Sequence, residues 1–322
     1  MSLTADELNN HVKNIMGVRS IKNKVVILCE GDISEVKNFK KNPSKYRSLE
    51  KFPDANFYKA CLPKSLKNYP VPTPVFFNCG DRANVIKAYL MLKELHAKNR
   101  TDSYLDINKL FVIIDLDIQK AKIDNYRFEN TEEIFNDLYN ELEINSNKID
   151  SHTIFTTGLI HKEAYFLLKC LEPIFDKDYH LYRNEKLDLN QIYSDIIEEI
   201  SEDQDLKQNF KKVACNRIDF LGLNCSNINE LKNAFREKFN HHLDDKLIKT
   251  LFLIRKVKPY WEKIHTIESK TKDHLSEKEI ERLSLNIAKF YSEQDDNRFH
   301  LTAIFKSIYR QAYTITSADQ GF

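Results

Sequence analysis

The sequence is poor in glycine and contains no long apolar run. Only 6 of its 322 residues are glycine, whereas 30% are charged, and this composition favours a helix-rich globular chain over a glycine-rich disordered one. No run of about 18 apolar residues occurs, so we expect no transmembrane helix. The amino terminus lacks the basic-then-apolar pattern of a secretory signal. We therefore expect a cytoplasmic protein with no membrane association.

Paired metal-binding cysteines and a nucleotide-binding loop are also missing. The six cysteines are scattered, and no two of them form a C-x-x-C pair. We therefore expect reduced thiols in a cytosolic protein, rather than a disulfide framework or a zinc site. No G-x-x-x-x-G-K-[ST] motif occurs, so this chain should not hydrolyse ATP through a P-loop. The net charge is only +1, so any role in nucleic-acid binding must depend on local patches.

Strand and helix patterns alternate through the first half of the chain. A capping box at residues 4–7 opens a helix that we expect to reach about Met16. Apolar runs predict four strands, at about residues 24–29, 74–79, 110–115 and 151–156. Helical patterns follow these strands, at about residues 33–40, 82–98, 131–142 and 161–171. The alternation predicts an α/β fold with a mostly parallel four-stranded sheet flanked by helices.

The second half of the chain has no convincing strand pattern. Helical periods occur at roughly residues 206–216, 227–240, 244–266, 276–294 and 299–313. We therefore predict an N-terminal helix over residues 1–21, an α/β domain over 22–172 and an all-helical C-terminal domain over 173–322. Trp261, in the helical part, is either a core residue or an anchor at an interface with a partner.

Two of the predicted strands end in acidic residues. The apolar run 25–29 is followed by Glu30-Gly31, and the run 110–114 is followed by Asp115-Leu116-Asp117. Right-handed crossovers bring the carboxyl ends of parallel strands to one edge of a sheet. If the third strand continues, Asp115 and Asp117 point to the same side. Three carboxylates around one point repel unless a cation neutralises them, and a hard divalent cation takes oxygen ligands. The alternative is that each acid is an ordinary solvent-facing strand terminus.

The segment between the first two strands is rich in basic residues. Residues 37–67 contain nine Lys or Arg against two acids, within a predicted insertion at about 41–73. Tyr46, Phe52, Phe57 and Tyr58 are interleaved among them. Basic side chains suit phosphates and exposed rings can stack on unpaired bases, whereas the alternative is a solvated insertion whose aromatic residues dock it onto the core. The candidate nucleic-acid-binding residues are Lys45, Arg47, Lys51, Lys59 and Lys64.

The order of these motifs resembles a known family. A strand followed by Glu30-Gly31, a strand followed by Gly80, and a strand followed by Asp115-Leu116-Asp117 are similar to the signature of the Toprim domain. The resemblance covers about residues 22–171. Ser34-Glu35 resembles the E-G-x-[ST]-E form of the nuclease branch, one residue later than in its tightest version, and the run 161–168 also resembles this branch. The branch includes the overcoming-lysogenization-defect nucleases and related anti-phage effectors.

The resemblance implies metal-dependent hydrolysis of phosphodiester bonds in DNA or in RNA such as tRNA. Asp115 and Asp117 would hold Mg²⁺ or Mn²⁺, and Glu30 would share that ligation or act as general base on the attacking water. Glu35 and Glu163 would be further metal ligands. Lys162 would lie close to the scissile phosphate.

Partners and alternatives also follow from the resemblance. Relatives of this branch often work with an ATPase, and the PARIS anti-phage system has a Toprim nuclease subunit beside a separate one. We therefore expect a separate ATPase or sensor protein as partner, with the helical half docking it or forming a homodimer. The alternatives are a catalytically silent Toprim scaffold that binds a partner or nucleic acid, and a primase-type phosphotransfer enzyme. The intact acid set argues against the first, and the lack of zinc-binding and polymerase-like segments argues against the second.

Overall fold

The computed structural model describes residues 3–33, 53–179, 187–266 and 277–319. At its centre is a four-stranded sheet in the order β2–β1–β3–β6, and every neighbouring pair is parallel. The strands are β1 (Val26–Cys29), β2 (Val75–Asn78), β3 (Leu110–Ile114) and β6 (Ile154–Thr156). The predicted α/β class and parallel four-stranded sheet are therefore confirmed.

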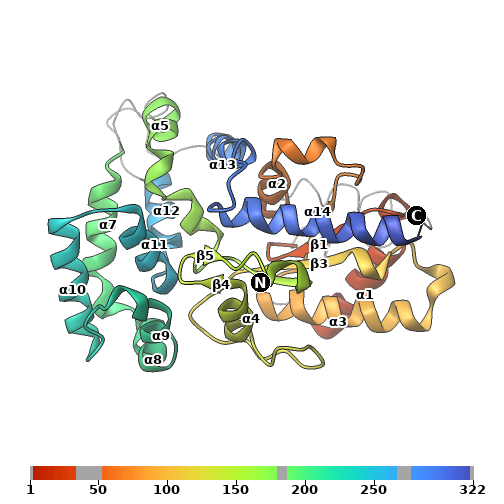
Figure 1. The fold of residues 1–322 in the computed structure, drawn as a ribbon, viewed down its shortest axis with the longest axis horizontal. Helices are drawn as coiled ribbons and strands as arrows, with labels where there is room; N and C mark the ends of the chain where they lie inside the picture. Colours follow the sequence, from red (N-terminus) through yellow and green to blue (C-terminus); the bar gives the residue numbers. More distant parts are fainter. Residues whose placement is uncertain (1–2, 34–52, 180–186, 267–276, 320–322) are drawn as a thin grey trace.

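The sheet is covered by helices on both faces. All residues of its four strands are buried, as expected for a parallel sheet enclosed between helical layers. Helices α1 (Ala5–Met16) and α3 (Arg82–Lys98) lie together on one side, and the long helix α14 (His300–Asp319) crosses the other (Figure 1). The Phe305 ring of α14 packs edge-on against Phe76 of β2, with centroids 6.1 Å apart.

The register of the sheet sets the place of the predicted acids. Cys29 at the end of β1 is aligned with Asn78 of β2 and with Ile113 of β3. The residues that follow these strands therefore emerge side by side at one edge. On β2 the chain turns at once into α3, because the Asp81 side chain caps that helix by accepting a hydrogen bond from the Asn84 N–H at 2.9 Å. This cap places Arg82 in the first helical turn, next to the same edge.

The remaining elements are mainly helical. The α-helices are α2 (Pro53–Ala60), α4 (Thr131–Leu138), α5 (Glu172–Ile174), α7 (Leu189–Glu198), α8 (Gln204–Asn209), α9 (Cys215–Ile218), α10 (Ile228–His241), α11 (Asp245–Ile254), α12 (Lys258–Thr266) and α13 (Glu277–Ser292). A short antiparallel pair, β4 (Tyr139–Asn140) and β5 (Glu143–Ile144), follows α4. This pair was not predicted, because two-residue strands carry no periodic pattern.

The predicted helix at 161–171 is wrong. The chain instead forms two short 3₁₀ turns, Lys162–Phe166 and Lys169–Leu171. Two carbonyls that a helix would use internally are taken by distant hydroxyls: Tyr291 donates to Tyr165 O at 2.6 Å, and Tyr193 donates to Leu167 O at 2.7 Å. Tertiary hydrogen bonds therefore override the helical period in this segment.

The predicted helix at 244–266 is two helices. The first, α11, ends at Ile254, and α12 begins at Lys258. Pro259 has no N–H to donate to the carbonyl of Arg255, so one helix cannot continue unbroken through this point, whereas proline is accepted in the first turn of a new helix. Arg255 is accordingly extended, with φ −112° and ψ 127°. The break turns Lys256, Lys258 and Pro259 toward the sheet edge, where they line the candidate site.

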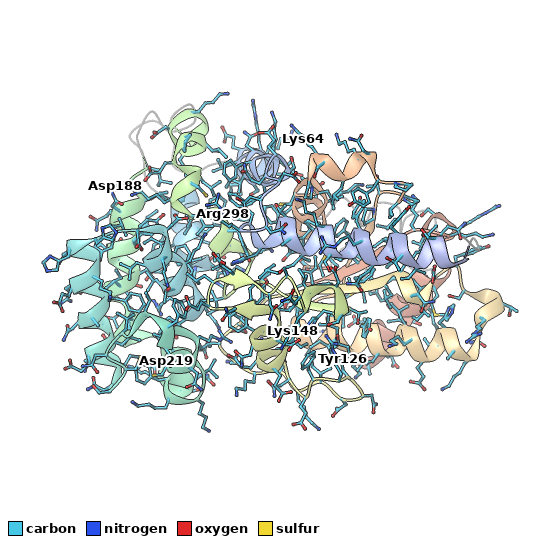
Figure 2. All side chains as sticks on the ribbon, in the orientation of Figure 1. Lys64, Tyr126, Lys148, Asp188, Asp219 and Arg298 are labelled. Carbon is cyan, nitrogen blue, oxygen red and sulfur yellow. The ribbon has the colours of Figure 1, made fainter. Side chains whose placement is uncertain are left out.

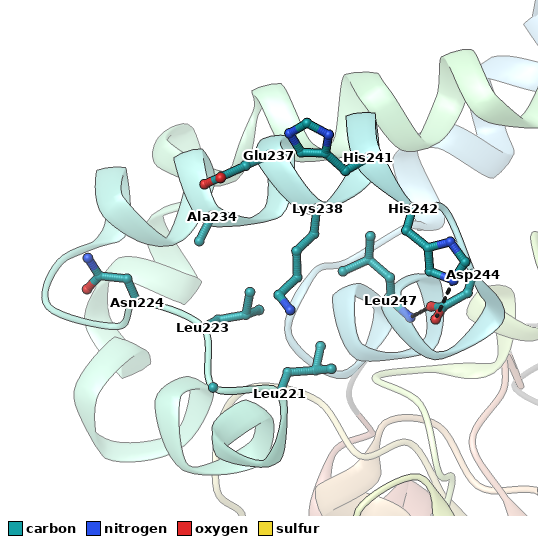
Figure 3. A pocket seen from close by; sticks show the side chains of 11 residues that line it. Leu221, Leu223, Asn224, Ala234, Glu237, Lys238, His241, His242, Asp244 and Leu247 are labelled. Atoms are coloured by element: carbon teal, nitrogen blue, oxygen red, sulfur yellow. Dashed lines mark hydrogen bonds and ion pairs between the residues drawn. The ribbon is translucent and has the colours of Figure 1, made fainter.

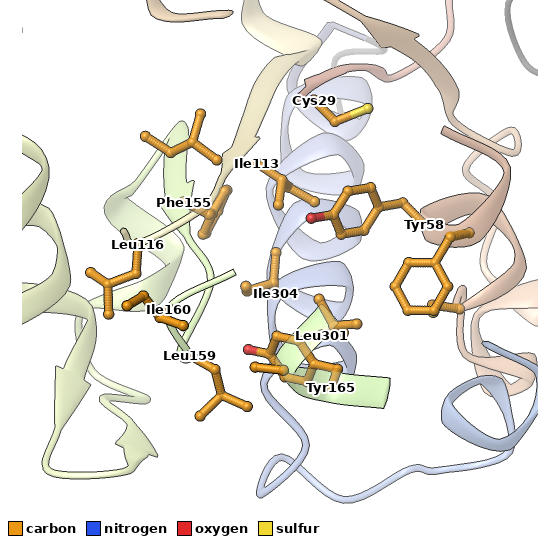
Figure 4. Close-up of a cluster of buried hydrophobic side chains, with 14 of the residues drawn as sticks. Cys29, Tyr58, Ile113, Leu116, Phe155, Leu159, Ile160, Tyr165, Leu301 and Ile304 are labelled. Carbon is orange, nitrogen blue, oxygen red and sulfur yellow. The ribbon is translucent and has the colours of Figure 1, made fainter. Parts of the chain in front are cut away.

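The last helix belongs to the core of the sheet. Leu301 and Ile304 of α14 pack among Ile113 of β3, Tyr58 of α2 and Tyr165 (Figure 4). Buried apolar residues form one continuous cluster from Leu8 to Ala312, so α14 completes the α/β layer although it is distant in sequence. The boundary at residue 172 stays a prediction. All six cysteines are free, and none of the helices in the described part of the chain is long and apolar enough to cross a membrane.

Candidate active site at the sheet edge

A cleft of about 580 Å³ opens at the carboxyl edge of β1, β2 and β3. Five of the predicted site residues line it, namely Glu30, Asp115, Asp117, Lys162 and Glu163. The opposite wall comes from the helical half, through Lys256, Lys258, Pro259 and Glu262. The sequence thus placed these five residues at a common site, whereas Glu35 lies outside the described residues.

A chain of hydrogen bonds joins the ends of three strands. The Glu30 carboxylate, which follows β1, accepts a hydrogen bond through Oε1 from the backbone N–H of Asp115, which follows β3, at 2.8 Å. Asp115 in turn accepts through Oδ1 from the backbone N–H of Lys162, in the segment after β6, at 3.1 Å. Each acid therefore fixes the backbone of the next strand end, and the two carboxylates are held in the same buried place.

The charges of these two carboxylates are poorly compensated. Burial raises the pKa of Glu30 to about 7, despite the hydrogen bond from the Asp115 N–H and the nearby Arg82 guanidinium. Burial also raises the pKa of Asp115 well above its ordinary value, and the negative charges of Glu30 and Glu163 raise it further. Strongly shifted carboxyl groups in a cleft are characteristic of functional sites.

Asp117 differs from Asp115 in its setting. The strand ends at Ile114, and Asp117 adopts a left-handed conformation with φ 46°. The strand therefore does not continue through Asp117, and the condition under which both aspartates would point to the same side is not met. The Asp117 side chain is 32% exposed, and its oxygens lie 3.7 Å from Arg82 Nη2 and 3.8 Å from Lys256 Nζ. These two cations compensate Asp117, which faces the more open part of the cleft.

Lys162 and Glu163 form an ionic group with a residue that the sequence did not single out. The Lys162 ammonium is paired with Asp54 at the start of α2 and lies 3.5 Å from Glu163 Oε1. Burial alone would raise the pKa of Glu163, but the Lys162 ammonium and the adjacent His161 ring hold that pKa well below its usual value. Glu163 is therefore ionised, and the Lys162 ammonium lies close to two carboxylates, those of Asp54 and Glu163.

The close approach of the chain at Gly31 and Gly80 explains why glycine follows β1 and β2. The two residues exchange backbone hydrogen bonds of 3.0 Å, which draws the ends of β1 and β2 together. Gly31 has φ 154°, and a Cβ there would lie 2.4 Å from Asn78 Nδ2 and 2.6 Å from Asp54 Oδ2. A side chain at residue 31 would push Asp54 away from the cleft, so only glycine fits.

Several residues of the cleft were missed by the sequence analysis. Asp54 lies in the basic segment without any motif, and Lys256 reaches the site only through the fold; His161 was given no role, although it lies next to the predicted Lys162 and Glu163. Arg82 lies beside the cleft, 3.7 Å from Asp117, and donates to Leu116 O at 2.9 Å. It had one usable signal in the sequence, because it follows Gly80 at the start of a helix. The sequence could reveal site residues at the strand ends, but it could not reveal residues such as Asp54 and Lys256, which other segments of the chain bring to the cleft.

The donor chemistry of the cleft suits a hard divalent cation in part. Its carboxylate oxygens are the ligands that Mg²⁺ and Mn²⁺ take, and the raised pKa values of Glu30 and Asp115 express negative charge that a cation would neutralise. Among the described residues, however, no three His, Cys, Asp or Glu side chains are close enough together to form a ready-made metal-binding group. Glu30, Asp115 and Asp117 share one cleft without closing around one point.

The predicted nucleic-acid surface is not supported where the structure describes it. Phe57 and Tyr58 are each only 2% exposed and belong to the core, so they dock α2 onto the sheet and cannot stack on bases. Lys64 is paired with Glu293 at 2.7 Å on the outside of the molecule (Figure 2). Neither Lys59 nor Lys64 lines the cleft. Lys45, Arg47 and Lys51, with Tyr46 and Phe52, lie outside the described residues.

A second cavity lies in the helical half, between α10 and the start of α11 (Figure 3). It measures about 470 Å³ and carries His241, His242 and Asp244 beside three leucines. His242 Nε2 lies 3.6 Å from Asp244 Oδ2, and the His242 side chain is 81% exposed. No predicted site residue lines this cavity.

Trp261 of the helical half is buried and packs on Phe166 with ring centroids 4.8 Å apart, so it is a core residue and no interface anchor.

Comparison with protein-family models, with curated proteins and with solved structures gives no match.

Proposed function

We propose that the protein is a metal-dependent nuclease of the Toprim type that hydrolyses phosphodiester bonds in the cleft at the sheet edge. The observation that carries this proposal is the buried link from Glu30 to Asp115, made between the ends of adjacent parallel strands. Carboxylates whose pKa values are raised, opposite a wall that carries lysines, suit chemistry on a negatively charged phosphodiester.

Glu30 is the proposed general base. Its Oε1 is occupied by the Asp115 N–H, which leaves Oε2 to accept a proton from the attacking water. A pKa of about 7 places this carboxyl near the value at which proton transfer is efficient at neutral pH. A bound Mg²⁺ or Mn²⁺ would stabilise charge on the phosphoryl oxygens and acidify that water.

The other cleft residues have proposed roles in holding metal and substrate. Asp115, Asp117 and Glu163 are the proposed carboxylate ligands, with Glu35 as a further one. Lys162 is proposed to contact the scissile phosphate, and Lys256 offers a second ammonium on the opposite wall. Both ammonium groups are paired with carboxylates in this structure, so binding of substrate would exchange these ion pairs for phosphate contacts.

The biological setting that we propose is bacterial anti-phage defence with a separate ATPase or sensor protein. Its support is the resemblance together with the absence of a P-loop from the sequence. The runner-up is a catalytically silent scaffold, which is favoured by one observation: the described carboxylates do not form a closed metal-binding group.

The test is a cleavage assay with the purified protein on single-stranded DNA, duplex DNA and tRNA, with Mg²⁺, Mn²⁺ or EDTA. We expect metal-dependent cleavage by the wild type, a loss of at least about 100-fold in Glu30→Gln and Asp115→Asn, and wild-type activity in Glu94→Gln. Glu94 is a matched control because it is an exposed acid on the outer face of α3, paired with Lys98. Equal cleavage by all four proteins would refute the proposed site, and binding of these nucleic acids without any cleavage would favour the scaffold.

A further inference from the structure

His161 has a fixed tautomer in this structure. Its Nε2 accepts a hydrogen bond from the backbone N–H of Val257 at 3.1 Å, and the residue is only 9% exposed. A backbone amide can only donate, so Nε2 carries no proton. The neutral ring must then carry its proton on Nδ1.

The protonated nitrogen faces an acid of the candidate site. His161 Nδ1 lies 3.1 Å from Glu163 Oε2, within ion-pair distance, but the angle of this contact does not make it a hydrogen bond, and Nδ1 has no other hydrogen-bond partner among the described residues. An ionised carboxylate is an acceptor with two oxygens. Glu163 Oε1 is near the Lys162 ammonium, at 3.5 Å, and the His161 Nδ1 lies near the other oxygen, Oε2.

The backbone around His161 is anchored on both sides. The Ile160 N–H donates to Phe252 O of α11 at 2.8 Å, and Ile160 O accepts from the Asp117 N–H at 2.7 Å. The segment 160–161 is therefore the joint between the sheet edge and the break that separates α11 from α12. The His161 ring lies at this point and contacts both the backbone N–H of Val257 and the carboxylate of Glu163.

We propose that His161 is a positioning residue, which holds the Glu163 carboxylate in the cleft through its Nδ1–H while Val257 fixes the tautomer. This inference rests on the proposed function only where it concerns metal, because it assigns Glu163 the role of a ligand. Partners that orient a metal-binding carboxylate are worth about 10–100-fold in metal affinity. The ring is thus more than a buried space filler.

The tautomer is measured without any assay of activity. We would record long-range ¹H–¹⁵N correlation spectra of the whole protein labelled with ¹⁵N-histidine, and assign His161 with a His161→Asn variant. The expected result is protonated Nδ1 and unprotonated Nε2 in the wild type, with a changed Nδ1 resonance in Glu163→Gln. A ring protonated on Nε2, or an Nδ1 chemical shift that is unchanged in Glu163→Gln, would overturn the inference.

Two substitutions separate the contacts of the ring. The Asn amide places a donor near the position of Nδ1, whereas the Gln amide reaches the position of Nε2. We expect His161→Asn to keep Mn²⁺ affinity within a few-fold, and His161→Gln to lose about 10-fold, as measured by the electron paramagnetic resonance signal of free Mn²⁺. Equal affinities of His161→Gln and wild type would contradict the positioning role. A wild type that binds no Mn²⁺ would refute the proposed function, while the spectra would still decide the tautomer and its contact with Glu163.

Discussion

The Glu30 carboxylate accepts a hydrogen bond from the backbone N–H of Asp115 at 2.8 Å. This bond spans two adjacent strand ends and buries a carboxyl whose pKa is raised to about 7. The folded protein therefore keeps an acid whose ionisation opposes folding. Sites of this kind commonly sacrifice stability for function.

Replacing Glu30 by Gln should stabilise the protein at alkaline pH. Because the pKa of Glu30 is raised from 4.5 to about 7 on folding, the folded state binds the proton more tightly. Stability is therefore lost as pH rises from 4.5 through 7. At pH 8 we expect Glu30→Gln to unfold at a higher denaturant concentration than the wild type. Its free energy of unfolding should be larger by up to about 3 kcal/mol, the free energy that corresponds to such a pKa shift. At pH 4 the two proteins should be nearly equal, and a Glu30→Gln variant that is less stable at pH 8 would contradict the raised pKa.

Gly31→Ala should damage both the fold and the cleft. The new Cβ would lie within 2.6 Å of Asn78 and Asp54, at a backbone φ of 154°, so we expect a loss of about 2–4 kcal/mol from overpacking and strain. Gly222→Ala is the matched control, because Gly222 also has positive φ, at 60°, but its added Cβ meets nothing within 4 Å. That control should cost only about 1 kcal/mol. Thermal unfolding of both variants decides the matter, and equal losses would mean that the close approach is unimportant.

Asp54→Asn should strengthen anion binding in the cleft. It removes the negative charge that pairs with the Lys162 ammonium, so that ammonium becomes available to a phosphate. We expect a several-fold lower dissociation constant for a short oligonucleotide, measured by fluorescence anisotropy in EDTA. Asp150→Asn, which breaks an exposed pair with Arg310, serves as the control and should leave binding unchanged. Weaker binding by Asp54→Asn would show that Asp54 supports the substrate site instead of competing with it.

Acid should unfold the protein through its buried histidines. Burial lowers the pKa of His11 and of His300 from 6.5 to about 4. Between these values the unfolded chain binds more protons than the folded one, so stability falls as pH decreases from 6.5 to 4. Each ring should contribute a loss of about 3 kcal/mol over this range. His11→Gln keeps a donor for Asn78 O, which the ring contacts at 3.0 Å, and should flatten the dependence. An unchanged slope in this variant would contradict the assignment to His11.

The strand ends were predictable from the sequence because they combine two local signals. A buried parallel strand is apolar throughout, and Glu30 or Asp115 interrupts that pattern at once. The parallel order follows from the alternation of strands and helices, so the meeting of these two acids could be predicted as well. The orientation of the Asp117 side chain could not be predicted, because nothing in an Asp-x-Asp motif indicates that its second aspartate adopts a left-handed backbone conformation.

The residues that complete the cleft were not predictable for a different reason. Asp54 and Lys256 are surrounded by ordinary polar sequence, and only the packing of α2 and the break after α11 bring them to the sheet edge. The turn at 162–166 reads as an amphipathic helix, but hydroxyl groups from Tyr193 and Tyr291 claim its carbonyls. Long-range hydrogen bonds of this kind have no local signature.

The most direct measurement is a crystal structure of the wild type soaked with Mn²⁺, with data collected to reveal the anomalous signal of manganese. We expect an anomalous peak in the cleft at the sheet edge, from a manganese ion bonded to a carboxylate oxygen of Asp115 and to at least one of Glu30, Asp117 and Glu163. A cleft without a peak at saturating Mn²⁺, with Asp54 and Lys162 still paired, would contradict this expectation.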